Sequence, residues 1–384
     1  MRQATSLRIV DEAAVLPALD AMAFEQAVLE SSTAARHDVR DEAGGDPGAY
    51  RLGGAALESW PFPHHPPLAR PVSICLTRDI VHLPAFGVVM FEDGAVLRAS
   101  ASEATHRRDL SCLPGARVEE AVIRLPIPAS TMNLERAAIF QAWGGNFNYG
   151  HFILDCLPSL VILDERGLLD RFPPIAPRLK TWQRDLIRLT IGAPVRELRD
   201  DFVRVGTAVH ATSMDYFLHG PGELLERTRA RILSRSPPPK RSGRRLYFSR
   251  RGHSMRVMIN ETALEAALRM RGFEIVRPER LSAAEQIAMM QEAQVVVGPS
   301  GAAMANALFA RSGARIVEIQ PENFASQWVW AVARRAGAEW CGYVCASPVS
   351  PERVAWRHRI RRGFQFGYQL PLDDFLVFVD ALLR

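Results

Sequence analysis

A histidine and an aspartate four residues apart lie in an aromatic stretch near the middle of this chain. The stretch reads Asn146-Phe147-Asn148-Tyr149-Gly150-His151-Phe152-Ile153-Leu154-Asp155. If the chain is helical from Gly150, His151 and Asp155 share one face of the helix. A histidine positioned by a carboxylate can act as a general base near neutral pH. The same spacing is as typical of a capped helix start whose histidine satisfies a buried carbonyl group.

A glycine turn in the last third of the chain could hold an anion. The apolar run 295–297 leads into Gly298-Pro299-Ser300-Gly301, and a small-residue helix is expected at 302–310. A strand, a glycine turn and a helix start expose backbone N–H groups and the positive end of the helix dipole. The turn fits neither G-x-G-x-x-G nor the P-loop, so no dinucleotide or ATP-hydrolysis motif is supported. A turn that only packs a helix on a strand fits equally well.

Charged residues follow the neighbouring strands. Arg250 and Arg251 end the expected strand at 246–248, and Glu318 is placed near the end of the strand at 315–319. A guanidinium can contact phosphate oxygens in a bidentate manner. A carboxylate at the same sheet edge can accept hydrogen bonds from ribose hydroxyls. Each could also be an ordinary surface residue, but together with the turn they indicate a diphosphate site.

The elements that would position these residues fall into two domains. At 384 residues the chain is long enough for two, and the proline-rich segment 234–243 reads as a solvated linker. Beyond it, strands and helices alternate over 244–350, which predicts an α/β, Rossmann-like domain with a parallel sheet. Residues 1–233 are expected to form an N-terminal domain with an irregular, β-rich start. We expect residues 351–384 to return to that N-terminal domain.

Composition excludes several other classes of protein. The net charge is +5, but the arginines are spread among acids without a basic-aromatic motif, so nucleic-acid binding is not expected. The five cysteines form no CxxC pair and predict reduced thiols in a cytoplasmic protein. His64 and His65 stand between prolines, which favours an exposed turn over a metal site. Neither a signal peptide nor an apolar membrane span is visible. The basic segment 353–362 is either a strand face or a peripheral contact with anionic lipid.

Several motifs together resemble glycosyltransferase family 61, over roughly residues 72–322. Asn148-Tyr149-Gly150-His151-Phe152, Asp155 and Leu157-Pro158 are similar to its N-Y-x-H-W/F-x-x-D-x-L-P signature. Matching residues follow in the expected order: Tyr247-Phe248-Ser249-Arg250, Arg256, Asn260-Glu261, Gly272-Phe273, Leu281, Glu285-Gln286-Ile287, Gly298, Gly301, Ala302, Asn306, Phe309 and Glu318. The family includes plant xylosyl- and arabinosyltransferases, animal N-acetylglucosaminyltransferases and bacterial capsule-type proteins.

The resemblance implies a GT-B-like fold, with two Rossmann-like domains facing a cleft. The C-terminal domain would bind a nucleotide-sugar donor, usually a UDP-sugar, and the sugar would be transferred with inversion. The acceptor would be a glycan or a lipid-linked glycan in polysaccharide biosynthesis of a bacterial, capsule-type kind. Neither a metal nor another cofactor is expected, and no D-x-D motif is present.

The resemblance also implies roles for individual residues. His151 would be the catalytic base and Asp155 its partner, with Asn148 and Tyr149 on the acceptor side. Glu318 would contact the donor ribose. The donor phosphates would be held by the following residues: Ser249, Arg250, Arg256, Gly298, Ser300, Gly301, Ala302 and Asn306.

One position departs from the family pattern. The family usually has histidine where this chain has Ser300, between Gly298 and Gly301. A serine can donate one hydrogen bond to a phosphate but carries no charge. The loss of a charge-assisted contact costs about 1.5–3 kcal/mol. An alternative function is therefore a catalytically degenerate relative that binds a nucleotide-sugar in polysaccharide assembly. A phosphate-ester hydrolase is disfavoured because no metal-ligand constellation is visible.

Overall fold

The chain divides into two compact units. The computed structural model describes residues 4–10, 14–16, 34–39, 50–53, 72–91, 95–97, 100, 117–119, 122–126, 132–142, 144–211, 222–346 and 366–384. The N-terminal unit comprises residues 1–43 and 68–235, and the C-terminal unit comprises 44–67 and 236–384. The boundary between Arg235 and Ser236 lies inside the segment read as a linker. The predictions for His64, His65, Cys112 and the basic segment 353–362 lie outside the described residues.

The C-terminal unit is an α/β layer structure around a parallel sheet. Its strands occur in the order β16-β14-β17-β18-β19-β4, and every neighbouring pair is parallel. The strands are β14 (Arg244–Phe248), β16 (Glu274–Val276), β17 (Ala293–Pro299), β18 (Arg315–Pro321), β19 (Glu339–Cys345) and β4 (Tyr50–Gly53). The helices between them are α7 (Glu261–Arg269), α8 (Ala283–Glu292), the 3₁₀ helix η7 (Ala302–Phe309) and α9 (Trp328–Arg335). Without β4, this is the doubly wound order 2-1-3-4-5. The mixed α/β class predicted for this region is confirmed.

Alternating side chains of the strands build the core of this unit. Val295, Val297, Val317 and Ile319 are fully buried against α7 and the last helix, α10 (Leu372–Leu383). Helix α8 starts at a capping box, because Ser282 and Glu285 each accept the other's backbone N–H. The motif predicted this start correctly.

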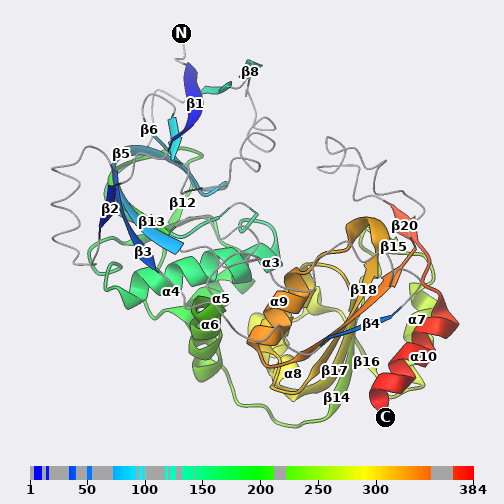
Figure 1. Cartoon of the computed structure of the whole chain (residues 1–384). Coiled ribbons are helices and arrows are strands. Elements are labelled where there is room, and N and C mark those ends of the chain that lie inside the picture. The colour runs from blue at the N-terminus through cyan, green and yellow to red at the C-terminus, as the bar shows by residue number, and fades with distance from the viewer. Residues whose placement is uncertain are drawn as a thin grey trace. The chain divides into compact units, whose positions relative to one another are not determined.

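The C-terminal unit also contains two segments that the sequence placed elsewhere. Strand β4 and helix α10 both belong to this unit (Figure 1). Strand β4 pairs with β19, and α10 buries Phe375 and Val379 in the core. Asn260 exchanges two hydrogen bonds with Leu370, at 2.8 and 3.0 Å. The prediction that 351–384 returns to the N-terminal domain is therefore wrong for residues 366–384. The apolar face of α10 is buried against the parallel sheet instead.

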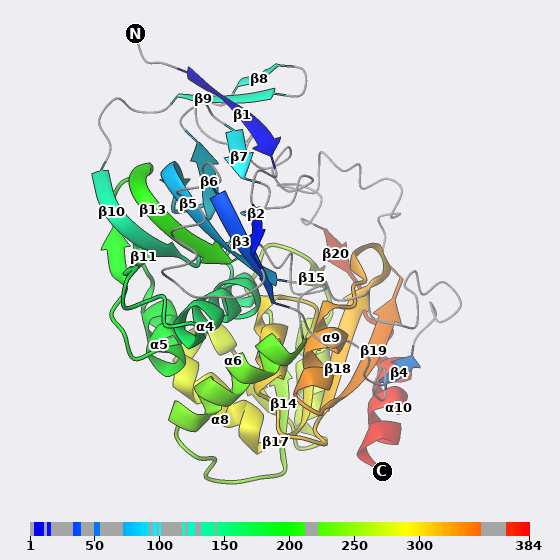
Figure 2. The same cartoon turned by 60° about the vertical axis from the view of Figure 1, so that its left-hand side comes forward.

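The N-terminal unit contains a larger mixed sheet. The strand order is β12-β11-β10-β13-β5-β6-β7-β1-β9-β8, and β2 and β3 lie off this path. Strand β10 (Met132–Ile139) is parallel to both β11 (Pro174–Pro177) and β13 (Val203–Ala211). The other strands near the site are β5 (Val72–Leu83), β6 (Val88–Phe91) and β12 (Arg196–Leu198). The remaining strands of this sheet are β1 (Ala4–Val10), β2 (Ala14–Leu16), β3 (Ala34–Val39), β7 (Ala95–Leu97), β8 (Arg117–Glu119) and β9 (Val122–Pro126). Helices α4 (Leu157–Glu165), α5 (Thr181–Thr190) and α6 (Gly222–Arg235) pack together beside the sheet (Figure 2).

Two predictions about the whole chain can be checked on the described residues. Cys75, Cys156, Cys341 and Cys345 are buried, and no disulfide joins them to one another. No helix in the described ranges has the length and apolar character needed to cross a membrane.

Candidate active site

The helix that carries His151 is built from three consecutive segments. They are α3 (Tyr149–His151), the π-helical segment η4 (Phe152–Cys156) and α4. Pro158, near the start of α4, has no N–H to donate to the carbonyl of Leu154, and its ring crowds that carbonyl. A wider π turn before Pro158 relieves this crowding, and such turns are frequent at functional sites.

His151 and Asp155 lie in contact within this helix. The distance between Nδ1 of His151 and Oδ2 of Asp155 is 2.8 Å. The Asp155 side chain is buried, whereas the His151 side chain is 12% exposed. With Nδ1–H donated to the carboxylate, Nε2 carries the lone pair and can accept a proton. The predicted pair is therefore present in the geometry that a general base requires.

The turn before the helix holds the imidazole in place. Gly144 has φ +82°, and a Cβ added there would lie 2.6 Å from Cδ2 of His151. The carbonyl of Gly144 accepts the Asn148 N–H at 2.8 Å, and the carbonyl of Gly145 accepts Nε2–H of the buried Gln183 at 2.8 Å. Sequence reasoning did not single out Gly144 or Gln183. The glycine pair 144–145 was visible as a signal, but nothing indicated the contact of Gln183 with it.

The two predicted acceptor-side residues have structural partners. Oδ1 of Asn148 caps the helix and accepts N–H groups from Gly150 at 2.9 Å and His151 at 3.3 Å. The ring centroid of Tyr149 lies 5.3 Å from that of Trp182, and Phe152 packs on the same Trp182 in a T-shaped arrangement, also with 5.3 Å between centroids. Asn148 is thus a positioning residue through its side-chain oxygen. An acceptor contact of Tyr149 stays a prediction.

A pocket of about 900 Å³ borders the same turn. It lies at the last residues of β11 and β12, and Asn146 contributes from the turn. Arg184 and Glu197 form a bidentate ion pair at 2.6 and 2.7 Å in its wall. The remaining charged lining residues are Arg178, Arg199, Asp200 and Asp201. The lining suits a hydroxyl-rich molecule better than an acyl chain.

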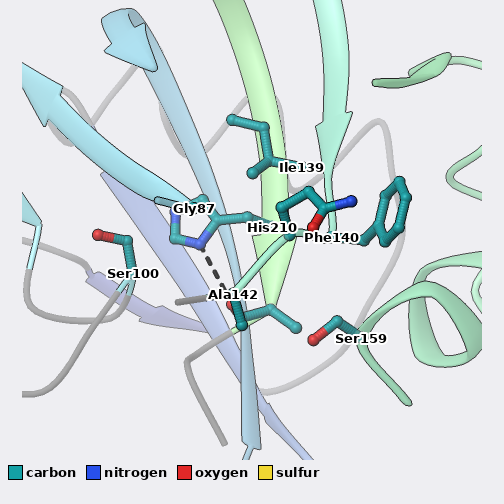
Figure 3. A pocket seen from close by; sticks show the side chains of 9 residues that line it. Gly87, Ser100, Ile139, Phe140, Ala142, Ser159 and His210 are labelled. Carbon is teal, nitrogen blue, oxygen red and sulfur yellow. Dashed lines mark hydrogen bonds between the residues drawn. The ribbon is translucent and has the colours of Figure 1, made fainter. Parts of the chain in front are cut away.

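A much smaller cavity lies between the sheet and α4. Its volume is about 10 Å³, enough for one water molecule, and His210, Gln141 and Ser159 line it (Figure 3). Nε2 of His210 and Nε2 of Gln141 are buried and have no hydrogen-bond partner among the described residues. The hydroxyl of Ser159 donates to the carbonyl of Asp155 at 2.8 Å. Hence this polar cavity adjoins the segment that carries the His151–Asp155 pair.

In the C-terminal unit, the predicted donor residues gather at the switch point of the sheet. The strand order reverses direction between β14 and β17, and ligands of open α/β sheets bind beyond the carboxyl ends of such strands. Ser249 and Arg250 follow β14, while Ser300 and Gly301 follow β17. The N–H of Ser249 donates to Val276 at 2.8 Å and that of Ser300 to Ile319 at 2.8 Å, which fixes both turns to the neighbouring strands.

Arg250 lies directly against the glycine turn. A Cβ added to Gly301 would lie 1.9 Å from Nη1 of Arg250. The backbone N–H of Arg250 donates to Glu261 at 2.7 Å, and Nη2 donates to the carbonyl of Met255 at 3.1 Å. Its Nε is buried without a hydrogen-bond partner among the described residues. Burial lowers the pKa of Arg250.

Arg256 is a second cation near this turn. Its guanidinium lies over the ring of Phe324, 4.2 Å from the centroid. Its backbone has φ +51°, a left-handed conformation that is costly for a residue with a side chain and is concentrated at functional sites. Burial, reinforced by the charge of Arg250, lowers the pKa of Arg256 to about 10. The chain therefore keeps two like charges close together at the switch point.

Glu318 is not at the sheet edge where the sequence placed it. It is fully buried within β18, with Ile319, Gln320 and Pro321 following in the same strand. Its Oε2 accepts the indole N–H of Trp340 at 3.0 Å. A ribose hydroxyl has no exposed atom of Glu318 to contact, so the predicted ribose placement is corrected.

Ser300 and Glu318 leave buried polar atoms unsatisfied beneath the turn. Oγ of Ser300 and Oε1 of Glu318 have no hydrogen bond of acceptable geometry among the described residues. Burial raises the pKa of Glu318 to about 7, although Gln320, the nearby Ser300, Trp340 and Arg256 act to lower it. An unsatisfied buried polar atom costs on the order of 1–3 kcal/mol, so an acceptor oxygen that reached the Ser300 hydroxyl would bind favourably.

The other predicted phosphate-site residues are mainly buried or structural. The Ser249 hydroxyl donates to the buried Glu265 at 2.7 Å, and the Asn306 amide donates to Gln286 at 2.8 Å. Gly298 is buried in β17, in register with Glu318. Ala302 is partly exposed at the start of η7, which is a 3₁₀ helix where an α-helix was implied. Ser249 and Asn306 therefore position the two turns through their side chains.

The described residues contain no cluster of three or more His, Cys, Asp or Glu able to hold a metal ion. The comparison with known families gives one match. Residues 149–317 match the family model described as Glycosyltransferase 61. This chain carries a glycosyltransferase 61 domain. The glycosyltransferase 61 domain starts at the helix of His151 and ends in β18, so it includes both the His151–Asp155 pair and the switch-point turns. None of the curated proteins matches this chain.

Proposed function

We propose that this glycosyltransferase moves a sugar, with inversion, from a nucleotide-sugar donor to a hydroxyl of a glycan or lipid-linked glycan. The observation that carries the donor side is a pair of buried donor groups at the switch point, Nε–H of Arg250 and the Ser300 hydroxyl, which have no hydrogen-bond acceptor among the described residues. Arg250 and Arg256 add positive charge at the same place. A nucleoside diphosphate has the charge and the oxygen acceptors that these groups lack.

The proposed reaction is a single displacement. Nε2 of His151 takes the proton of the acceptor hydroxyl while that oxygen attacks the anomeric carbon. The bond from the anomeric carbon to the diphosphate oxygen breaks, and Arg250, Arg256 and the N–H groups of the turn stabilise the departing charge. Asp155 holds the imidazole in the reactive tautomer. With these cations in place, the residues supply the charge compensation that a metal ion supplies elsewhere.

We place the acceptor in the pocket of about 900 Å³ in the N-terminal unit. Asn146 lines this pocket and lies in the turn that packs on His151, so an acceptor there would border the base. In this proposal the two units form the two halves of a GT-B enzyme. The setting would be bacterial polysaccharide assembly in the cytoplasm, at or near the membrane surface, where lipid-linked acceptors occur.

Calorimetric titration with UDP, without divalent metal, tests the donor side. We expect Arg250→Met to weaken UDP binding by about tenfold or more, since a charge-assisted contact is lost. Arg188→Met is the matched control, because the Arg188 side chain is 75% exposed in the N-terminal unit. Equal UDP affinity in the wild type and Arg250→Met would contradict the proposed donor site.

A catalytically degenerate nucleotide-sugar-binding protein is the second candidate. The observation behind it is Ser300, where the family resemblance leads us to expect histidine. Ser300→His discriminates the two functions in a transfer assay. A wild type that is inactive, with a variant that gains transfer, would favour the degenerate protein.

A further inference from the structure

A second positively charged pocket lies next to the switch point in the C-terminal unit. Its volume is about 510 Å³, and it is lined by residues of β14, α7, β16 and α8 and by residues that follow β14 and β16. Five of its lining residues are arginines: Arg244, Arg251, Arg269, Arg277 and Arg280. We call it the arginine pocket. Glu265 is the only acidic residue in its lining.

The acids near the pocket are already paired. Glu265 accepts from Arg251 at 3.1 Å and from Arg269 at 3.3 Å. Arg244 is held by Glu274, at 2.9 and 2.5 Å, and by Glu292 at 2.9 Å. These carboxylates therefore offset the charge of three of the arginines.

Arg277 and Arg280 remain without compensation. Neither forms an ion pair with any residue in the described part of the chain. Glu279 lies between them in sequence, is exposed and is absent from the pocket lining. The 3₁₀ turn η6 (Pro278–Arg280) thus contributes its arginine to the pocket lining without its acid. Uncompensated guanidinium groups in one pocket favour a bound anion.

The pocket and the switch point share a backbone turn. Arg250 packs on Gly301 at the switch point, and its neighbour Arg251 lines the arginine pocket. Between the two sites, the Ser249 hydroxyl accepts the N–H of Arg251 at 3.2 Å and donates to Glu265 at 2.7 Å. One ligand could therefore engage both sites through adjacent residues of the same turn.

We propose that the arginine pocket binds a second oxyanion, a carboxylate or phosphate, carried by the molecule that occupies the switch point. This rests on the proposed donor site. The enzyme would then prefer a donor with an acidic sugar, and Arg277 and Arg280 would be its specificity-determining residues. A separate phosphate is the other source of the same chemistry.

The test is a calorimetric comparison of three probes: UDP-glucuronate, UDP-glucose and inorganic phosphate. The proteins compared are the wild type and the double variant Arg277→Gln/Arg280→Gln. We expect the wild type to bind UDP-glucuronate about tenfold or more tightly than UDP-glucose, and the variant to lose this preference while keeping its UDP-glucose affinity. Arg166→Gln/Arg188→Gln removes the same charge from the N-terminal unit and should keep the preference.

Two further outcomes also support or overturn the proposed arginine pocket. Phosphate binding that competes with UDP-glucuronate and is lost in the double variant supports the arginine pocket. This holds even if UDP-glucose does not bind, a result that would count only against the proposed donor site. Equal affinity for the acidic and neutral donors, with phosphate bound no better by the wild type than by the double variant, overturns the proposal. Unchanged thermal unfolding of the variant, expected because neither arginine forms an ion pair within the described ranges, excludes misfolding as the cause of a loss.

Discussion

The guanidinium of Arg250 occupies the space that a side chain on Gly301 would need. The φ of Gly301 is 172°, an extended value that any residue can adopt, so its backbone does not require glycine. The requirement is steric, because a Cβ would come within 1.9 Å of Nη1 and 3.0 Å of Cζ of Arg250. The glycine of the turn and the arginine after β14 therefore form one feature of the switch point.

Gly301→Ala should displace Arg250 without unfolding the C-terminal unit. We expect UDP affinity to fall by about tenfold or more, since the cation leaves its position beside the diphosphate. Isothermal titration measures this directly. Gly192→Ala is the control, because a Cβ there meets nothing within 4 Å. Undiminished UDP binding in Gly301→Ala would show that Arg250 does not contact the donor.

His151→Ala should slow transfer strongly and leave donor binding unchanged. We expect turnover to fall by about 10²–10⁴-fold, the usual contribution of a general base. UDP affinity should stay constant, because the donor residues belong to the C-terminal unit. Turnover at the wild-type rate would remove His151 from the mechanism.

Asp155→Asn tests the positioning role of the carboxylate separately. An amide can donate to Nδ1, which would leave the proton on Nε2 and block its action as a base. We expect kcat to fall with little change in KM, and the pH dependence of kcat to shift. A change in KM alone would indicate that Asp155 acts on the acceptor pocket and leaves His151 unaffected.

The sequence predicted the helices and strands of the C-terminal unit better than it predicted which distant segments belong to that unit. The alternation of apolar runs, the capping box at Ser282 and the glycine turn are local signals, and the structure contains each. Strand β4 gave no signal of its own, because joining β19 is a pairing between distant parts of the chain. Helix α10 is amphipathic in sequence, but periodicity does not say which unit its apolar face covers.

The site was predictable in its residue types and less so in their environments. The spacing of His151 and Asp155 correctly indicated a contact. Glu318 was misplaced because the strand was expected to end near it, whereas β18 continues to Pro321. The Trp340 contact that holds its carboxylate comes from the next strand and left no trace in sequence spacing.

Glu318→Gln should make the C-terminal unit more resistant to a rise in pH. The pKa of Glu318 is raised to about 7 in the folded protein against 4.5 in the unfolded chain, so the folded state binds more protons between these values. Stability is therefore lost as pH rises from about 4.5 to 7, by on the order of 3 kcal/mol. Thermal unfolding at pH 5 and pH 8 should show a gain for the variant at pH 8 that is absent at pH 5. An equal shift at both pH values would mean that the carboxyl does not titrate in this range.

The N-terminal unit should show the opposite pH response. His82 and His210 are buried in β5 and β13, and burial lowers the pKa of each to about 4, against 6.5 in the unfolded chain. The unfolded state binds more protons between these values, so stability is complete above about pH 6.5 and falls as pH drops towards 4. The expected loss is on the order of 3 kcal/mol per histidine.

Hydrogen exchange of β5 and β13 at pH 7.5 and pH 5 should show faster opening at pH 5. His210→Gln should reduce this difference, while His253→Gln, at an exposed histidine of the other unit, should not. Identical exchange in β13 at both pH values would show that the two imidazoles are not held neutral by burial.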